Sequence, residues 1–203
     1  MKPFSFFAKR GFFAKPDYLD ESECLSLCQE LRIKDQTPAT IENETYSGID
    51  LTVRRTSQVK PLRETRNRFQ AYFQDLMPDL VEHFQINLNF CEGPQFLRYQ
   101  AGDFFEAHRD TSESPDRKLE RLVSVIIFLN SPSTTKIDYV GGDLIFYGLV
   151  DHPAFKKVGY PLQPETGLLI AFLSDMAHEV KPIIQGERFS VVTWFGYKSD
   201  PAG

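Results

Sequence analysis

The spacing of hydrophobic positions divides the chain into a helical first part and a strand-rich second part. Between Asp20 and Leu31, and again between Leu62 and Phe84, apolar side chains recur every three or four positions, the spacing of one helix face. From Gln95 onward they alternate with polar residues or form unbroken runs, as in half-buried and buried strands. We therefore expect a mainly β chain with N-terminal supporting helices, an α+β arrangement.

The first predicted helix has a recognisable start. Asp20 is a good N-cap residue, and Glu23 three positions later completes a pattern like a capping box. Before it, residues 1–18 are aromatic and basic, with a candidate opening strand around Phe12. The apolar face of the helix consists of Cys24, Leu25, Leu27, Cys28 and Leu31.

Two prolines set the expected limits of the second helix. Pro61 favours the first helical turn, where a missing N–H costs nothing. Pro78 predicts an interruption, because proline removes a hydrogen bond inside a helix, and a shorter helix is expected after it. The apolar positions are Leu62, Phe69, Tyr72, Phe73 and Leu76 before this proline, and Leu80, Val81 and Phe84 after it.

Five segments of the second part have the pattern of strands. The run at 122–129 is almost wholly apolar, as expected of a buried strand. Short strands separated by turn signals favour an all-β sandwich or barrel. The polar stretches 111–121 and 131–140 are expected to be loops and candidate lids. The strand segments are 95–100, 122–129, 143–147, 167–173 and 189–197.

Length and composition are those of an ordinary globular protein. The 203 residues are 41% hydrophobic and 25% charged, so we expect one domain over 1–203, with 1–90 as the N-terminal segment and helical support and 91–197 as the β core. A formal net charge of −5 argues against nucleic acid as a partner. One group of basic residues is expected to be a solvated helix face and the loop before it. It comprises Arg54, Arg55, Lys60, Arg63, Arg66 and Arg68.

The three cysteines cannot all pair within one chain. Cys24 and Cys28 are one helical turn apart and Cys91 is remote, so we expect small buried thiols in a reducing compartment, the cytoplasm. No apolar run approaches the roughly 20 residues of a membrane span, and the start of the chain lacks the pattern of a signal peptide. A membrane is therefore not an expected partner, and the sequence leaves the oligomeric state open.

The candidate chemistry begins with His108 and Asp110, in the stretch YQAGDFFEAHRD. In an extended strand, residues two positions apart point to the same face, so this imidazole and this carboxylate can reach one point while Arg109 faces away. Two histidines and one carboxylate form a known site for ferrous iron with open positions. An H-x-D motif alone also occurs by chance in surface turns, so a third ligand has to support it.

That third ligand has to come from His83, His152 or His178. His83 lies on the predicted helix before the sheet and His152 in a loop, whereas His178 follows a predicted strand. Ten residues beyond His178 stands Arg188, and Ser190 shares its strand face. An arginine fork beside a hydroxyl suits a carboxylate, so a dicarboxylic co-substrate can reach the metal with one end and this clamp with the other.

These features together resemble the Fe(II)- and 2-oxoglutarate-dependent dioxygenases of the prolyl 4-hydroxylase type. The matching stretches cover about residues 94–197 in the family's order and spacing: FLRYQAGDFFEAHRD, RLVSVIIFLN, GGDLIFY and GLLIAFLSDMAHEVKPIIQGERFSVVTWF. The resemblance implies a double-stranded β-helix core of the jelly-roll or cupin type. It also implies Fe(II), 2-oxoglutarate as co-substrate, O2, and ascorbate as a reductant.

The resemblance also implies roles for individual residues. The implied catalytic iron ligands are His108, Asp110 and His178. Arg188 is implied to bind the far carboxylate of 2-oxoglutarate, with Ser190 as its hydroxyl partner and Tyr99 lining the co-substrate pocket. Oxygen-sensing relatives have a tyrosine hydroxyl where this chain has Phe128, and we expect Ser190 to replace it.

The resemblance says less about the substrate. Trp194 matches an aromatic position near the substrate, and Arg109 and Arg98 are expected to shape its pocket. Related halogenases have Gly or Ala at the position of Asp110, so this carboxylate predicts hydroxylation rather than halogenation. The expected substrate is a prolyl residue of a peptide or protein. A free amino acid or small biosynthetic metabolite stays open, as does a non-catalytic binding module on the same scaffold.

Overall fold

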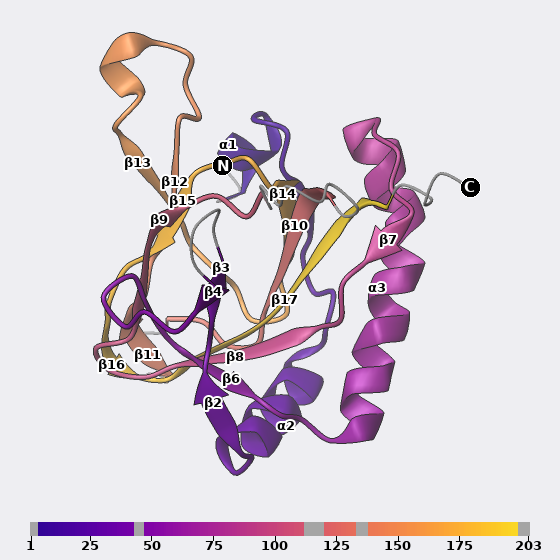
Figure 1. The fold of residues 1–203 in the computed structure, drawn as a ribbon, viewed down its shortest axis with the longest axis vertical. Helices are drawn as coiled ribbons and strands as arrows, with labels where there is room; N and C mark the ends of the chain where they lie inside the picture. The colour runs from indigo at the N-terminus through magenta and orange to yellow at the C-terminus, as the bar shows by residue number, and fades with distance from the viewer. Residues whose placement is uncertain (1–3, 43–46, 112–119, 133–137, 199–203) are drawn as a thin grey trace.

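The computed structural model describes residues 4–42, 47–111, 120–132 and 138–198. Within these residues the chain is mainly β, with two large antiparallel sheets and two long helices (Figure 1), as the hydrophobic pattern predicts. Residues 112–119 and 133–137, which belong to the two loops predicted as lids, lie outside the described part.

The larger sheet contains the strands predicted from the longest apolar runs. Its described strands follow the order β1 (Phe13–Lys15), β14 (Leu169–Leu173), β10 (Glu120–Phe128), β17 (Arg188–Tyr197), β8 (Gln95–Tyr99), β6 (Ser57–Val59) and β2 (Gln36–Pro38), with β7 (Phe90–Cys91) paired to β17. All of these pairs are antiparallel. Alternate residues of each strand therefore face opposite sides of the sheet.

The smaller sheet faces the larger one. Its described strands follow the order β13 (Gly159–Leu162), β12 (Leu144–Tyr147), β15 (His178–Val180), β9 (Phe104–His108) and β5 (Arg54–Arg55). Two short pairs accompany it: β11 (Tyr139–Gly141) with β16 (Ile183–Gly186), and β3 (Ile41–Glu42) with β4 (Ser47–Gly48). Beyond β12 and β13 the hairpin, with the short 3-10 helix η1 (Pro153–Phe155), extends away from the body of the molecule (Figure 1).

The helices cover the outer face of the larger sheet. α2 (Glu21–Arg32) and α3 (Arg63–Phe84) lie on this side of the sheet (Figure 1). They share one core cluster with outward-facing strand residues such as Val125 and Phe195. The inward-facing side of the same strands forms a second cluster with the smaller sheet, including Phe128, Phe146 and Phe172, and the short helix α1 (Ser5–Ala8) adds Phe7 to it. No helix among the described residues is long and apolar enough to cross a membrane.

Three details of the helices differ from the sequence prediction. Leu25 is 56% exposed and does not belong to the apolar face. Pro61 precedes the N-cap residue Leu62, so the second helix begins two positions later than predicted. Pro78 does not interrupt the helix. The carbonyl of Gln74, which loses its usual N–H partner, lies on an exposed residue, so water can satisfy it while the buried side keeps its packing.

Candidate metal centre and active site

The structure brings His108, Asp110 and His178 together. β9 and β15 are antiparallel neighbours, and His108 lies directly opposite His178 in their register. The sequence analysis placed His108 and Asp110 in one strand. In the structure β9 ends at His108, so Asp110 lies just beyond the strand. Its backbone N–H donates to the Ser174 carbonyl at 2.8 Å, which ties this segment to the turn after β14. One ligand atom from each of the three side chains lies within 4.8 Å of the others.

The spacing and the tautomers of these groups fit a divalent metal. His108 Nε2 lies 3.5 Å from Asp110 Oδ1, and His178 Nε2 lies 3.6 Å from Asp110 Oδ2. Two ligands bound at about 2.1 Å can be up to about 4.2 Å apart, so one ion fits between them. His108 Nδ1 lies 2.8 Å from the Glu106 carbonyl, and His178 Nδ1 lies 3.0 Å from the Met176 carbonyl. Protons on both Nδ1 atoms leave both Nε2 lone pairs available to the metal.

The surroundings also hold the ligands in metal-binding protonation states. Burial acts to raise the pKa of Asp110, but His178, His108 and a 2.7 Å hydrogen bond from Ser124 outweigh it and hold that pKa well below its ordinary range. Burial lowers the pKa of His178 to about 4, and the neighbouring His108 acts in the same direction. An anionic carboxylate and a neutral imidazole are the forms that coordinate metals.

A cavity of about 560 Å³ contains this cluster. It lies between the two sheets, and inward-facing residues of β8, β10 and β17 form much of its wall. Its volume is within the usual range for small-molecule sites. Of the site residues predicted from the sequence, all except Arg98 line this cavity: His108, Asp110, His178, Arg188, Ser190, Tyr99, Arg109 and Trp194.

Arg188 places a buried positive charge in the cavity wall. It is 2% exposed, and its Cζ lies 5.2 Å from the ring centroid of Tyr99 and 5.4 Å from that of Phe128. Its Nε and the hydroxyl of Tyr139 are buried without a hydrogen-bond partner among the described residues. Burial raises the pKa of Tyr139 to about 12, against the opposing charge of Arg188, so the hydroxyl stays protonated. Free buried donors beside a guanidinium suit an anionic ligand.

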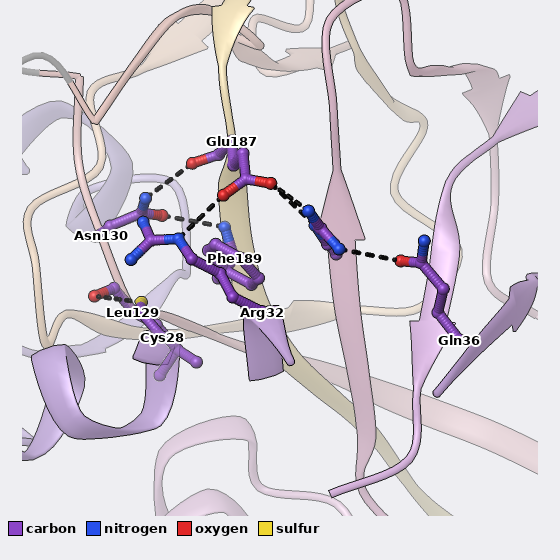
Figure 2. Close-up of polar contacts among 8 residues, drawn as sticks. Cys28, Arg32, Gln36, Leu129, Asn130, Glu187 and Phe189 are labelled. Atoms are coloured by element: carbon purple, nitrogen blue, oxygen red, sulfur yellow. Dashed lines mark hydrogen bonds and ion pairs between the residues drawn. The ribbon is translucent and has the colours of Figure 1, made fainter. Parts of the chain in front are cut away.

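Asn130 holds the backbone on both sides of Arg188 (Figure 2). Its Nδ2 donates to the Glu187 carbonyl at 2.7 Å, and the Phe189 N–H donates to its Oδ1 at 2.8 Å. Asn130 is 3% exposed, so these bonds are shielded from water. The sequence interpretation did not single out Asn130, although it ends the motif stretch RLVSVIIFLN.

The structure corrects the expectation for Arg98. Its Nε donates to Glu187 Oε1 at 2.9 Å and its Nη1 donates to Gln36 at 3.2 Å, and it does not line the cavity. Its neighbours Leu97 and Tyr99 occupy the inward-facing positions of β8. Because side chains alternate along a strand, Arg98 has to face the other side of the sheet.

Arg54 differs most from its expected environment. The sequence predicted a solvated position, but Arg54 is 8% exposed and lines the cavity. β5 pairs with β9, which sets Arg54 opposite Phe105, and its Cζ lies 4.6 Å from the Phe105 ring centroid. Phe105 in turn stacks on His108 with centroids 3.5 Å apart. No local sequence signal predicts this pairing, so the placement of Arg54 depends on tertiary structure.

Comparison with known protein families gives a match over the part of the chain that contains these site residues. The family model described as the 2OG-Fe(II) oxygenase superfamily matches residues 94–196, half of the chain. The chain belongs to the 2OG-Fe(II) oxygenase superfamily. Members of this superfamily use Fe(II), 2-oxoglutarate and O2, in agreement with the cofactors expected from the sequence. The matched residues include the three clustered ligands and Arg188.

Curated relatives of this 2OG-Fe(II) oxygenase include PKHD-type hydroxylases. One from Shewanella baltica (strain OS155) is 28% identical over 161 residues, which cover 76% of this chain and 66% of the relative. One from Synechococcus elongatus is 32% identical over 110 residues, covering 53% of this chain and 44% of the relative. The chain therefore spans less than two thirds of the length of these curated relatives.

Solved structures establish the fold of this 2OG-Fe(II) oxygenase. A prolyl-4-hydroxylase from Pseudomonas putida superposes with a TM-score of 0.71 at 24% identity, covering 98% of this chain and all of the other. A prolyl hydroxylase from Trichoplax adhaerens, in complex with a hypoxia inducible factor peptide fragment, gives 0.67 at 17% identity, covering 94% of this chain and 85% of the other. These likenesses confirm the double-stranded β-helix core.

Proposed function

We propose that this chain is an Fe(II)- and 2-oxoglutarate-dependent dioxygenase that hydroxylates an unactivated C–H bond. The observation that carries the proposal is the convergence of His108, Asp110 and His178 in a cavity that also holds the buried Arg188. Membership of the superfamily and the PKHD-type relatives support it. When bound, the iron supplies the oxidising chemistry, in which 2-oxoglutarate, O2 and a C–H bond become succinate, CO2 and an alcohol.

The chain's own residues hold the reactants in place. His108, Asp110 and His178 would hold the iron, and a site with only three protein ligands would leave room for the co-substrate and O2. Arg188 binds the far carboxylate of 2-oxoglutarate, and Ser190, 1% exposed, adds a hydroxyl donor. Tyr99 and Phe128 keep water away from this ion pair. With Asp110 as a ligand, a bound iron would have no position free for a halide, which favours hydroxylation.

The proposed substrate is a prolyl residue of a peptide or protein. Support comes from the two structural neighbours whose names describe prolyl hydroxylases. Trp194 offers an aromatic wall for a pyrrolidine ring, and Arg109 lies exposed at the cavity. A free amino acid or small metabolite is the second candidate, because a cavity of about 560 Å³ can enclose one.

A turnover assay tests the proposed reaction. Purified protein is incubated with Fe(II), 2-oxoglutarate and O2 in the presence of proline-containing peptides or free amino acids. We expect succinate to form and the substrate to gain about 16 Da. A non-catalytic binding module would retain 2-oxoglutarate without forming succinate.

Two variants test the proposed roles of Asp110 as a metal ligand and Arg188 as the residue that binds 2-oxoglutarate. Asp110→Ala should abolish turnover, and full activity in this variant would show that the ligand assignment is wrong. Arg188→Ala should mainly raise the KM for 2-oxoglutarate, because the charge-assisted pair is lost. His152→Ala is the control, since this exposed histidine does not line the cavity, and its kinetics should match the unmodified protein.

A further inference from the structure

Arg54 carries a buried positive charge that the described residues do not balance. It is 8% exposed, and no described carboxylate lies within ion-pair distance of it. Its Nη1 donates to the Thr40 carbonyl at 2.9 Å, whereas its Nε has no hydrogen-bond partner in the described part of the chain. Buried charges are ordinarily paired, because removing an unpaired charge from water is costly.

The position of Arg54 connects this charge to the metal-binding cluster. The guanidinium lies on the ring of Phe105, and the same ring stacks on His108 with an interplanar angle of 16°. Arg54, Phe105 and His108 all line the same cavity. A ligand group bound by Arg54 therefore lies within a few side chains of the metal position.

The charges of the cavity wall favour an anionic substrate. Among the described residues that line it, Asp110 is the only carboxylate, against four arginines. Arg121 is neutralised by Glu92, to which its Nη2 donates at 2.8 Å. Arg188 is assigned to 2-oxoglutarate in the proposed function. Arg54 and the more exposed Arg109 then have no ion-pair partner among the described residues once metal and co-substrate are bound.

We propose that Arg54 binds a carboxylate of the substrate, so that the substrate class is a carboxylate-bearing molecule. This inference rests on the proposed function and adds a recognition site to it. Because its Nε–H has no partner among the described residues, the planar guanidinium can hold a carboxylate along its Nε and Nη2 edge through two parallel hydrogen bonds. The carboxylate belongs either to a free amino acid or to an acidic side chain of a peptide, and both present the same group to Arg54.

Binding measurements under anaerobic conditions test this site without turnover. The protein is loaded with Fe(II) and 2-oxoglutarate and titrated calorimetrically with free L-amino acids and their amides. Capped peptides that pair proline with glutamate, or with glutamine, form a second series. We expect carboxylate probes of one series to bind more tightly than their amides, and the series that binds identifies the source of the carboxylate. If no carboxylate is preferred over its amide in either series, the inference is wrong.

Variants of Arg54 test whether this residue is responsible for the tighter binding of carboxylates than of amides. Arg54→Met keeps an unbranched stem against Phe105 but removes the charge, and we expect carboxylate affinity to fall about 10- to 100-fold with little change for amides. Arg54→Lys should recover only part of the affinity, because the two-pronged geometry is lost. An unchanged carboxylate preference in Arg54→Met would overturn the inference.

Melting temperatures distinguish ligand binding by Arg54 from a purely structural role. Arg54→Met should melt at or above the temperature of the unmodified protein, because an unpaired buried charge is removed. Arg121→Met should melt lower, because it breaks the Glu92 pair and a 4.0 Å contact with Trp194. A comparable drop for Arg54→Met would show a structural role and contradict the proposal.

The affinity for 2-oxoglutarate distinguishes a substrate-binding role of Arg54 from a role in binding the co-substrate. We expect Arg54→Met to bind 2-oxoglutarate within about twofold of the unmodified protein. A loss there would assign Arg54 to the co-substrate and refute the substrate role. If the unmodified protein binds neither Fe(II) nor 2-oxoglutarate, the proposed function is wrong. Failure of the Arg54 inference would instead appear only when the Arg54 variants are compared with an unmodified protein that does bind both.

Discussion

The buried hydroxyl of Tyr139 lies close enough to the guanidinium of Arg188 to interact with its charge. The sequence pointed to Ser190 as the replacement for the hydroxyl that Phe128 lacks. The structure adds Tyr139, which is 1% exposed and has no hydrogen-bond partner for its hydroxyl among the described residues. Tyr139 comes from β11 and belongs to none of the motif stretches, so only the folded chain reveals it. A buried donor without a partner is costly unless a ligand completes it.

We therefore expect Tyr139→Phe to weaken 2-oxoglutarate binding. The loss should be about 3- to 10-fold, the value of one neutral hydrogen bond. Anaerobic titration of the Fe(II)-loaded protein measures it. Tyr160→Phe serves as control, because Tyr160 stacks on Phe6 and belongs to β13, an edge strand of the smaller sheet. Equal affinities for the unmodified protein and Tyr139→Phe would remove this hydroxyl from the site.

All three cysteines are free; Cys24 and Cys28 are buried, as the sequence predicted, whereas Cys91 is only partly buried. Burial raises the pKa of Cys24 and of Cys28 to about 12 and that of Cys91 to about 11. At pH 8 only about one thiol in a thousand, or fewer, is then a thiolate. We expect iodoacetamide to label the native protein slowly and all three thiols rapidly in urea. Rapid native labelling of Cys24 would contradict its burial.

At the scale of elements, the capping residue Asp20 predicted a helix end correctly, whereas Pro78 did not. The Asp20 side chain accepts a hydrogen bond from the Glu23 N–H at 2.8 Å, as the N-cap pattern predicts. The Glu23 carboxylate does not complete a capping box but lies 3.4 Å from Arg68. Pro78 failed as a stop signal because Leu76 and Leu80 are buried on either side of it. Tertiary packing there outweighs one missing hydrogen bond.

Pro78→Ala should consequently stabilise the protein. It restores one backbone hydrogen bond on the exposed face of α3, and we expect the free energy of unfolding to rise by about 1–2 kcal/mol after the greater freedom of the unfolded chain is subtracted. Urea denaturation measures the change. Glu82→Ala, an exposed substitution in the same helix, should stay within about 0.5 kcal/mol. A less stable Pro78→Ala protein would contradict the view that Pro78 costs the helix a hydrogen bond without contributing to its packing.

At the scale of the whole molecule, antiparallel pairing assembles the site from distant segments. β9 and β15 bring His108 and His178 together, and β17 brings Arg188 to the same cavity. The remaining histidines lie elsewhere: His83 contacts the Gly11 carbonyl at 3.2 Å and His152 caps η1. Of the three histidines considered as the third ligand, the fold places His178 beside His108 and Asp110, as the family resemblance implied.

Metal binding should therefore stabilise the native fold. At about 100 times its Kd, anaerobic Fe(II) should add about 2.7 kcal/mol to the free energy of unfolding, because the unfolded chain has no assembled site. A rise in melting temperature with Fe(II) concentration measures this. His178→Ala should lose the effect, whereas His152→Ala should keep it. A metal-dependent rise that survives in His178→Ala would place the ion elsewhere.

The sequence by itself determined the local features of this protein. Periodicity located the helices and the main strands, and the motif stretches around His108, Asp110, His178 and Arg188 carried the family resemblance that implied the chemistry. Tertiary structure decided which surfaces face each other. The burial of Arg54, the outward position of Arg98 and the burial of the Tyr139 hydroxyl depend on pairings between strands far apart in the chain, which leave no local pattern.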